Sequence, residues 1–310
     1  MRPLWPPLLR RGLALAAGAA LLGGCSAGAA PSLGGVHPSG TTLGASPAHT
    51  SHSAPAPPRD PWNPRPASVA ALGDSITRGF DACKPLSDCP EVSWATGTDS
   101  GVDSLATRLV GAPTAAKRSW NEARSGARMA DLPGQMAEAA RRVPDLVTVM
   151  VGANDACQDS VNLMTSVADF RASFVTAMHR LRVGAPKAQV YVSSVPDLKR
   201  LWSTGRGNPL GRQIWKLGIC ASMLGDSQDD SAAAQRRRES VYDRVVAYNT
   251  VLKDVCGKDL RCRYDGGAVF DFRFTGDQLS PWDWFHPSKD GQGKLAEIAY
   301  RNVTAPGAPA

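Results

Sequence analysis

The strongest constraint on the fold comes from residues 145–151, where nearly every side chain is apolar. A strand that is apolar on both faces is typical of a parallel sheet covered by helices on both sides. Comparable strand-like runs occupy residues 68–72, 117–121, 188–195 and 268–272. Because stretches with helical spacing separate them, the chain indicates βαβ units with right-handed crossovers. We therefore expect one α/β domain, a three-layer α/β/α sandwich with about five parallel strands.

The expected helices carry apolar residues at intervals of three and four positions. They span residues 102–110, 128–142, 166–182, 235–255 and 289–301. Residues 196–231 contain Gly and Trp without such a period, so an irregular connection is expected there. The run Arg236-Arg237-Arg238 is expected to face solvent.

The first 25 residues predict export. Arginines precede an apolar run over residues 13–22, which is far shorter than the roughly 20 residues that cross a bilayer. The ending LGGC, residues 22–25, resembles a bacterial lipobox, in which Cys25 becomes the lipid-modified first residue. An ordinary signal peptide with an incidental cysteine is the alternative. Either way the expected location is outside the cytoplasm, lipid-anchored on the outer face of the cell membrane or secreted.

Residues 26–66 are dominated by Ala, Pro, Ser, Gly, Thr and His. Such a segment cannot bury enough apolar surface to offset the entropy of ordering, so it predicts a flexible linker. The folded domain is then expected over residues 67–302, followed by a flexible tail over 303–310.

The formal net charge of +7 is unevenly spread along the chain. Five arginines and one aspartate lie within residues 1–65, so the domain itself is only weakly basic. It shows no basic stripe interleaved with aromatic residues, and no nucleic-acid partner is therefore expected.

The chain has seven cysteines, and setting Cys25 aside leaves an even number. In an exported chain that favours disulfides. Because no C-x-x-C pair is present, a zinc site is not expected. Proximity along the chain favours two pairs and leaves a third by remainder: Cys83–Cys89, Cys256–Cys262 and Cys157–Cys220.

Ser75 is the candidate nucleophile. It follows the strand-like run 68–72 and Gly73, at the carboxyl end of a strand, where open α/β sheets place their ligands. A serine hydroxyl needs a nearby base, a group that orients the base, and donors for the oxyanion. His286 is the candidate base, because His179 lies in an amphipathic helix and the other histidines lie in the linker. Asp283, three residues before His286, is placed to orient it.

Two further strand ends offer oxyanion donors. Asn154 follows the run 145–151 and has a side-chain amide, and Gly126 follows the run 117–121 with an unshielded N–H. Asn, Asp and Gly also favour plain turns, so neither position is decisive alone.

The four motifs together resemble the SGNH, or GDSL, hydrolase superfamily. They are Gly73-Asp74-Ser75, Gly126 within N-x-A-x-x-G, Gly152-x-Asn154-Asp155 and Asp283-x-x-His286. Thr77 stands where a G-x-S-x-G elbow requires Gly, which argues against an α/β-hydrolase. Within the superfamily, Ser93-Trp94, Asp131-Leu132-Pro133 and Asp283-Trp284-Phe285-His286 resemble the phospholipase B branch.

The resemblance implies a role for each matching residue. Ser75 is the nucleophile, His286 the base and then the acid, and Asp283 its orienting partner. The Ser75 and Gly126 N–H groups and the Asn154 amide form the oxyanion hole. The implied fold is a flavodoxin-like sandwich, and no metal or cofactor is implied.

The expected function is that of a serine esterase or lipase, which hydrolyses phospholipid or other lipid acyl esters through an acyl-Ser75 intermediate. The expected partners are this ester substrate and a membrane reached by the N-terminal anchor, and a monomer is expected. Five aromatic residues are candidates for the acyl site, with core packing as the alternative: Trp94, Trp202, Trp282, Trp284 and Phe285. Alternative functions are a carbohydrate O-acetyl esterase and a non-catalytic lipoprotein that binds lipid or glycan.

Overall fold

The computed structural model describes residues 62–309. The predicted signal peptide, Cys25 and most of the predicted linker lie outside the described residues.

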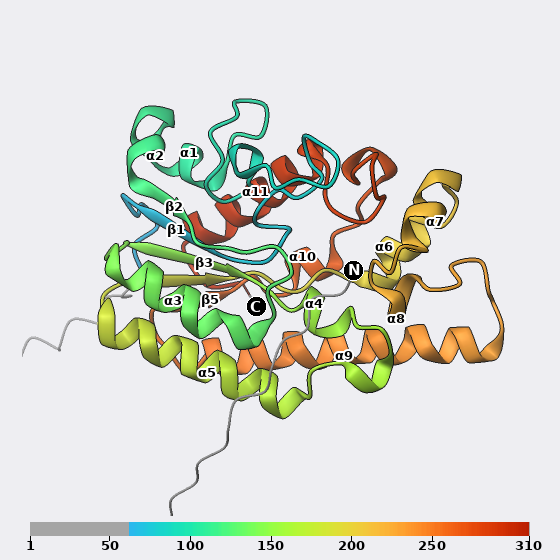
Figure 1. Cartoon of the computed structure of the whole chain (residues 1–310). Coiled ribbons are helices and arrows are strands. Elements are labelled where there is room, and N and C mark those ends of the chain that lie inside the picture. Colours follow the sequence, from blue (N-terminus) through green and yellow to red (C-terminus); the bar gives the residue numbers. More distant parts are fainter. Residues whose placement is uncertain (1–61, 310) are drawn as a thin grey trace, which may run out of the picture. The chain divides into compact units, whose positions relative to one another are not determined.

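A five-stranded parallel sheet organises the described part of the chain, with the order β2-β1-β3-β4-β5 (Figure 1). The strands are β1 (Val69–Gly73), β2 (Ser119–Asn121), β3 (Leu146–Met150), β4 (Gln189–Val192) and β5 (Cys262–Tyr264). Every residue of β1 and β3 is buried, and Val69 pairs with Leu146 at one end and Gly73 with Met150 at the other. This order is the flavodoxin-like one. The predicted α/β fold with a parallel sheet is confirmed.

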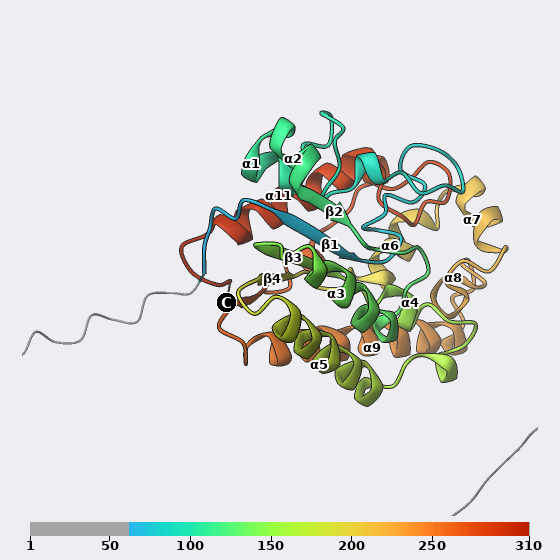
Figure 2. The same cartoon turned by 60° about the vertical axis from the view of Figure 1, so that its left-hand side comes forward.

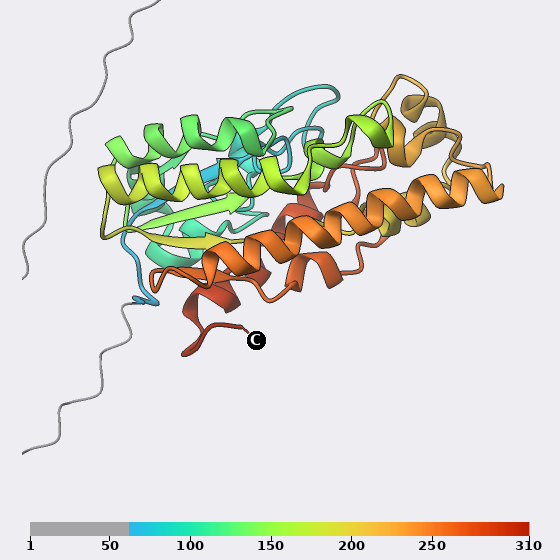
Figure 3. The same ribbon diagram turned by 90° about the horizontal axis from the view of Figure 1, so that it is seen from below.

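Helices cover both faces of the sheet (Figures 1 and 2). One face packs against α1 (Leu105–Val110), α2 (Ala112–Arg118) and α11 (Lys289–Thr304). The other face packs against α3 (Leu132–Arg141), α5 (Val167–Gly184) and α9 (Ala232–Cys256), which lie alongside one another in Figure 3. The short helices are α4 (Ala153–Ala156), α10 (Ala268–Asp271) and four 3-10 turns, η1 (Pro90–Val92), η2 (Met129–Asp131), η3 (Val161–Leu163) and η4 (Gly276–Gln278).

The last strand is not where the apolar pattern predicts it. The apolar pattern predicts a strand over residues 268–272, but α10 occupies residues 268–271, and the fifth strand is β5. The cause is Asp265, whose carboxylate accepts hydrogen bonds from the N–H groups of Gly267 and Val269 and so starts a helical turn. β5 is an edge strand with the sequence CRY, which lacks the apolar run of a central strand.

The connection over residues 196–231 is helical, contrary to expectation. It contains α6 (Leu198–Gly205), α7 (Pro209–Trp215) and α8 (Ala221–Leu224), which lie together beside the carboxyl ends of the strands (Figure 1). Side-chain caps start two of them: Asp197 accepts from Arg200 N–H, and Asn208 accepts from two N–H groups of α7. Short capped helices of this kind carry too few residues to show a period.

The expectation that the whole run 236–238 faces solvent is wrong at Arg238, which is 1% exposed. Its guanidinium donates to the carbonyl oxygens of Asp229 and Asp226, each at 2.8 Å, and stacks on the Trp202 ring at 4.2 Å. Arg238 therefore anchors the loop between α8 and α9.

The folded part extends beyond the predicted bounds of 67 and 302 at both ends. Trp62, assigned to the linker by sequence, is buried and donates from Nε1 to the Val303 carbonyl at 2.9 Å. Val303, assigned to the tail, is fully buried, and α11 continues to Thr304. Between residues 62 and 309 there is no helix with both the length and the apolar character needed to cross a bilayer.

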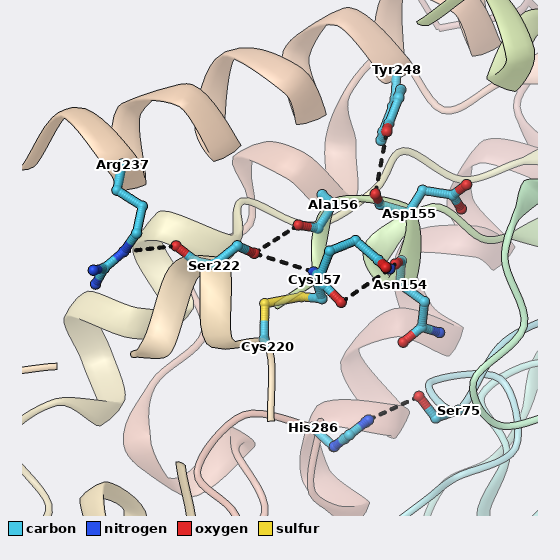
Figure 4. Close-up of a disulfide and its surroundings, with 11 residues drawn as sticks. Ser75, Asn154, Asp155, Ala156, Cys157, Cys220, Ser222, Arg237, Tyr248 and His286 are labelled. Carbon is cyan, nitrogen blue, oxygen red and sulfur yellow. Dashed lines mark hydrogen bonds between the residues drawn. A yellow bond between two sulfur atoms is a disulfide. The ribbon is translucent and has the colours of Figure 1, made fainter. Parts of the chain in front are cut away.

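All three predicted disulfides are confirmed. Cys83–Cys89 closes a loop after Ser75, Cys256–Cys262 joins α9 to β5, and Cys157–Cys220 joins the end of α4 to the start of α8. Hydrogen bonds reinforce the last of these, because Ser222 Oγ donates to the Ala156 carbonyl and Ser222 N–H donates to the Gln158 carbonyl, each at 2.8 Å (Figure 4).

Removing the Cys157–Cys220 bridge is expected to destabilise the fold more than removing the Cys256–Cys262 bridge. The two pairs are separated by 63 and 6 residues, and the entropy of a cross-linked unfolded chain depends on loop length. Double replacement by Ala should lower the free energy of unfolding by about 4 kcal/mol for the first pair and about 2 kcal/mol for the second. Guanidinium titration of the two variants checks the order, and equal losses would contradict it.

Candidate active site

Ser75 lies just past the carboxyl end of β1, two residues after Gly73, a position where the backbone requires glycine. Gly73 has φ +147°, and a Cβ at this position would lie 2.1 Å from the Met150 carbonyl oxygen. The buried Gln135 side chain accepts from Gly73 N–H at 2.8 Å and donates to its carbonyl at 2.9 Å. The turn that follows is held by Asn121, whose amide donates to the Thr77 carbonyl. These contacts fix the direction in which Ser75 leaves the sheet.

The structure brings Ser75, His286 and Asp283 together. Ser75 Oγ lies 2.8 Å from His286 Nε2, and His286 Nδ1 lies 2.5 Å from Asp283 Oδ2. Asp283 is fully buried, and its Oδ1 accepts from the N–H groups of Phe285 and His286 at 2.9 Å. Since the carboxylate accepts from Nδ1–H, the Nε2 lone pair is left to accept the serine proton.

The electrostatics favour a charged Asp283–His286 pair. Burial by itself would raise the pKa of Asp283, but the His286 charge and hydrogen bond hold it below its ordinary value. Burial alone would lower the pKa of His286, but the Asp283 charge and hydrogen bond raise it, helped by Asp74 and Asp81. Burial also raises the pKa of Asp74, the neighbour of Ser75, to about 7. The site therefore stabilises positive charge on the imidazole.

The loop that carries Asp283 is fixed from α7. Trp215 Nε1 donates to the Asp283 carbonyl at 2.7 Å, and Trp215 is buried. The Phe80 ring lies 5.0 Å from the His286 ring, which limits how far the imidazole can turn. Neither aromatic residue was predicted to support the site, because only the packing of α7 and the Ser75 turn brings them to this loop.

Asn154 extends from α4 towards the Ser75–His286 pair (Figure 4). Its Nδ2 donates to the Ala127 carbonyl at 3.0 Å, and an amide nitrogen has a second hydrogen to donate elsewhere. The neighbouring Asp155 is buried, and its Oδ2 accepts from Met129 N–H at 2.8 Å. Both contacts tie the segment after β2 to α4.

Gly126 belongs to that segment. It is exposed with φ +79°. It directly precedes Ala127, whose carbonyl accepts the hydrogen bond from the Asn154 amide. Within residues 62–309, neither its N–H nor that of Ser75 has a hydrogen-bond acceptor. The three predicted oxyanion donors therefore come from the ends of β1, β2 and β3, although Gly126 is not part of the cavity wall described next.

Ser75 and His286 open into a cavity of about 250 Å³. Its polar members are Ser75, His286 and Asn154, and the remainder of the wall is largely apolar. The apolar wall comprises Ile76, Ala153, Leu198, Leu201, Ile219, Phe285 and the Cys157–Cys220 disulfide, with Gly218 beside it. Figure 4 shows the disulfide close to Asn154 and the reacting pair.

A sequence model of the family described as GDSL-like Lipase/Acylhydrolase matches residues 69–299. The match covers most of the chain and includes all four motifs. This chain belongs to the GDSL-like lipase/acylhydrolase family. The finer resemblance to the phospholipase B branch stays a prediction. A search of curated proteins found no match to the chain.

Several solved structures resemble this GDSL hydrolase. An extracellular lipase from Streptomyces rimosus is 19% identical, with 77% of this chain and 100% of that chain covered and a TM-score of 0.42. Phospholipase A1 from Streptomyces albidoflavus NA297 is 20% identical, with 77% and 100% covered and a TM-score of 0.40. A family two carbohydrate esterase from Clostridium thermocellum, in complex with cellohexaose, is 16% identical, with 76% and 63% covered and a TM-score of 0.47. Likenesses of this strength do not bear on the substrate.

Of the five aromatic residues considered for the acyl site, Phe285 alone lines the cavity of this GDSL hydrolase among the described residues. Trp94 is fully buried and donates to Thr77 Oγ1, and Trp202 lies between two guanidinium groups. Trp284 packs against the glycines of α6 and α7, and Trp282 is 41% exposed. The expectation is therefore wrong for the four tryptophans: none of them lines the cavity, and Trp94, Trp202 and Trp284 are held by the packing contacts just described.

The apolar wall is instead supplied by α6, by the α7–α8 connection and by the disulfide. Leu198 and Leu201 belong to α6, which starts soon after β4 ends. Asp197, an N-cap residue directly before α6, is the sequence signal that indicates a helix here. Ile219 had no such signal, since its place depends on the bridge from Cys220 to α4.

His179, set aside on sequence grounds, is exposed on α5. Within residues 62–309, two side-chain groups bring metal-ligand atoms within 4.8 Å of one another. One consists of Cys83, Cys89 and Glu91, and its sulfurs are used in a disulfide. The other consists of Asp81, Asp283 and His286, whose Nδ1 is already held by Asp283.

Proposed function

We propose that this protein is a serine ester hydrolase that cleaves lipid acyl esters through an acyl-Ser75 intermediate. The observation that carries the proposal is the chain of contacts from Ser75 Oγ to His286 to Asp283, at 2.8 and 2.5 Å, opening on an apolar cavity. Family membership supports the reaction class.

In the first step His286 Nε2 takes the Ser75 proton as Oγ attacks the ester carbonyl carbon. The oxyanion that forms accepts hydrogen bonds from Ser75 N–H, Gly126 N–H and the free hydrogen of the Asn154 amide. His286, now an imidazolium beside Asp283, returns the proton to the departing alcohol. Water then attacks the acyl-Ser75 ester with His286 again as base, which releases the carboxylic acid and restores the serine.

The lining of the cavity supports the proposal that it binds the acyl part of the substrate. Its wall of leucine, isoleucine, phenylalanine and disulfide sulfur suits a hydrocarbon chain and offers few groups to hydrogen-bond a sugar ring. At about 250 Å³ it is smaller than typical ligand pockets of about 300–1,000 Å³. We therefore infer a preference for short acyl chains.

The small volume of the cavity also favours a second candidate function, that of a carbohydrate O-acetyl esterase. A carbohydrate O-acetyl esterase needs room for an acetyl group alone, with the sugar outside the cavity. The two candidates share every catalytic step and differ in what lies beyond the ester oxygen.

We also propose that the protein works outside the cytoplasm, anchored through Cys25. Three disulfides within residues 62–309 support an oxidising location.

A fluorophosphonate probe tests the serine mechanism. We expect covalent labelling of the wild type, mapped to Ser75 by peptide mass spectrometry, and none in Ser75→Ala. Labelling at another residue would mean that Ser75 is not the nucleophile, and the absence of labelling would favour a binding protein. Substrate class is tested by comparing nitrophenyl esters of increasing chain length, phosphatidylcholine and acetylated xylan. Faster release of acetate from xylan than of fatty acid would favour the carbohydrate esterase.

A further inference from the structure

A second carboxyl group lies behind the Asp283–His286 pair. Asp81 ends the turn that begins at Ser75, and it is 1% exposed. Its carbonyl accepts from Ser280 Oγ at 2.7 Å, which ties it to the loop that carries Asp283. Asp81 Oδ1 accepts from Leu86 N–H, while Oδ2 is buried and has no donor within residues 62–309.

Asp81 faces the two residues on which the serine depends. A carboxylate oxygen of Asp81, a carboxylate oxygen of Asp283 and a ring nitrogen of His286 lie within 4.8 Å of one another. The Asp283 carboxyl group helps to raise the pKa of Asp81 through its charge and a side-chain hydrogen bond. Two buried carboxylates at this distance repel each other, so at low pH the pair holds a proton.

The surroundings decide which carboxyl group holds that proton. Asp283 accepts from three N–H groups, namely those of Phe285 and His286 and the imidazole Nδ1–H. Among the described residues, the Asp81 carboxylate accepts from Leu86 N–H alone. Hydrogen bonds to the charged form stabilise it, so Asp283 stays ionised and Asp81 carries the proton.

We propose that Asp81 is a positioning residue of the hydrolytic site, donating a hydrogen bond to Asp283 when protonated and strengthening His286 as a base when ionised. This rests on the proposed serine mechanism. Ionisation of Asp81 adds a negative charge beside the imidazole, and that charge favours the imidazolium that forms in the transition state.

The charges around the cluster set the pH range of the effect. Burial, followed by the Asp283 charge, raises the pKa of Asp81 to about 6. His286 faces Asp81 with the opposite tendency, and Asp74 acts on His286 from the Ser75 turn. Asp81 is therefore neutral in mildly acidic solution and charged above neutrality.

The test is the pH profile of Asp81→Asn. The amide keeps the shape, accepts from Leu86 N–H and donates to Asp283, so it mimics the protonated acid at every pH. We expect kcat/KM for a nitrophenyl ester to match the wild type near pH 5 and to fall roughly three- to tenfold below it at pH 8.5, since one pKa unit is tenfold. Asp277→Asn, an exposed change of equal charge on the segment before Asp283, should follow the wild type throughout.

A loss by the same factor at every pH would show a merely structural role, and no loss at pH 8.5 would also overturn the proposal. An NMR titration of labelled histidine in the full chain tests the proposal on the wild type even if Asp81→Asn folds poorly. In the wild type the His286 ring should report a second titration near pH 6, absent in Asp81→Asn, and a single titration would overturn the proposal. If the wild type hydrolyses no ester, the proposed function fails, while the NMR titration still tests the coupling.

Discussion

Ser75→Ala is expected to lower kcat/KM for a short-chain nitrophenyl ester by about 10⁴-fold or more. The change removes the only atom that Ser75 contributes to the His286 contact at 2.8 Å, so no acyl-enzyme forms. What remains is the acceleration that the oxyanion donors and substrate binding provide to attack by water. Ser75 is 8% exposed and deletion of its hydroxyl breaks no other side-chain contact, so the fold should be unaffected.

The measurement is steady-state hydrolysis with thermal unfolding on the same samples. Ser240→Ala, an exposed serine on α9 that bonds within its own helix, is the matched control and should keep full activity. Retention of more than a small fraction of activity in Ser75→Ala, with an unchanged melting temperature, would mean that another group is the nucleophile.

Asp283→Asn is expected to lower kcat/KM by about 10⁴-fold as well. The amide has a similar shape, and its oxygen can keep the two N–H donors of Phe285 and His286. Its NH₂ group then faces His286 Nδ1, which favours the tautomer with the proton on Nε2. In that tautomer Nε2 donates to Ser75 Oγ and cannot take its proton.

A matched variant distinguishes this loss from a general effect of removing a carboxylate from the segment. Asp277→Asn removes one exposed carboxylate from the same segment and should leave kcat/KM unchanged. If Asp283→Asn keeps more than about a hundredth of the activity while remaining folded, orientation by Asp283 is not required.

The central strands could be predicted because burial on both faces is visible in one residue after another. β1 and β3 lie within one or two residues of the expected runs 68–72 and 145–151. β5 could not be predicted, because an edge strand of three residues with Arg263 at its centre has no apolar run. The burial of Arg238 could not be predicted, because a charged residue is expected to face water unless partners such as the Trp202 ring are known.

The sequence by itself determined the features that depend on residues close together along the chain. Glycine at position 73, serine at 75 and the Asp283-x-x-His286 spacing define their chemistry within a few residues, and their order along the chain identifies the family. The parallel sheet follows from the alternation of apolar runs, and it places the ends of β1, β2 and β3 at one edge.

Only the tertiary structure decided what surrounds the reacting pair. The cavity wall comes largely from α6 and the α7–α8 connection, and the Cys157–Cys220 bridge joins that connection to the end of α4, which carries Asn154. Asp81 faces Asp283 because the turn after Ser75 packs against the loop before α11. Contacts between residues so far apart along the chain depend on the packing of whole elements, and no local pattern records them. Ser75 could therefore be recognised from its neighbours in sequence, while the cavity beside it and the carboxyl group behind Asp283 depend on neighbours in space.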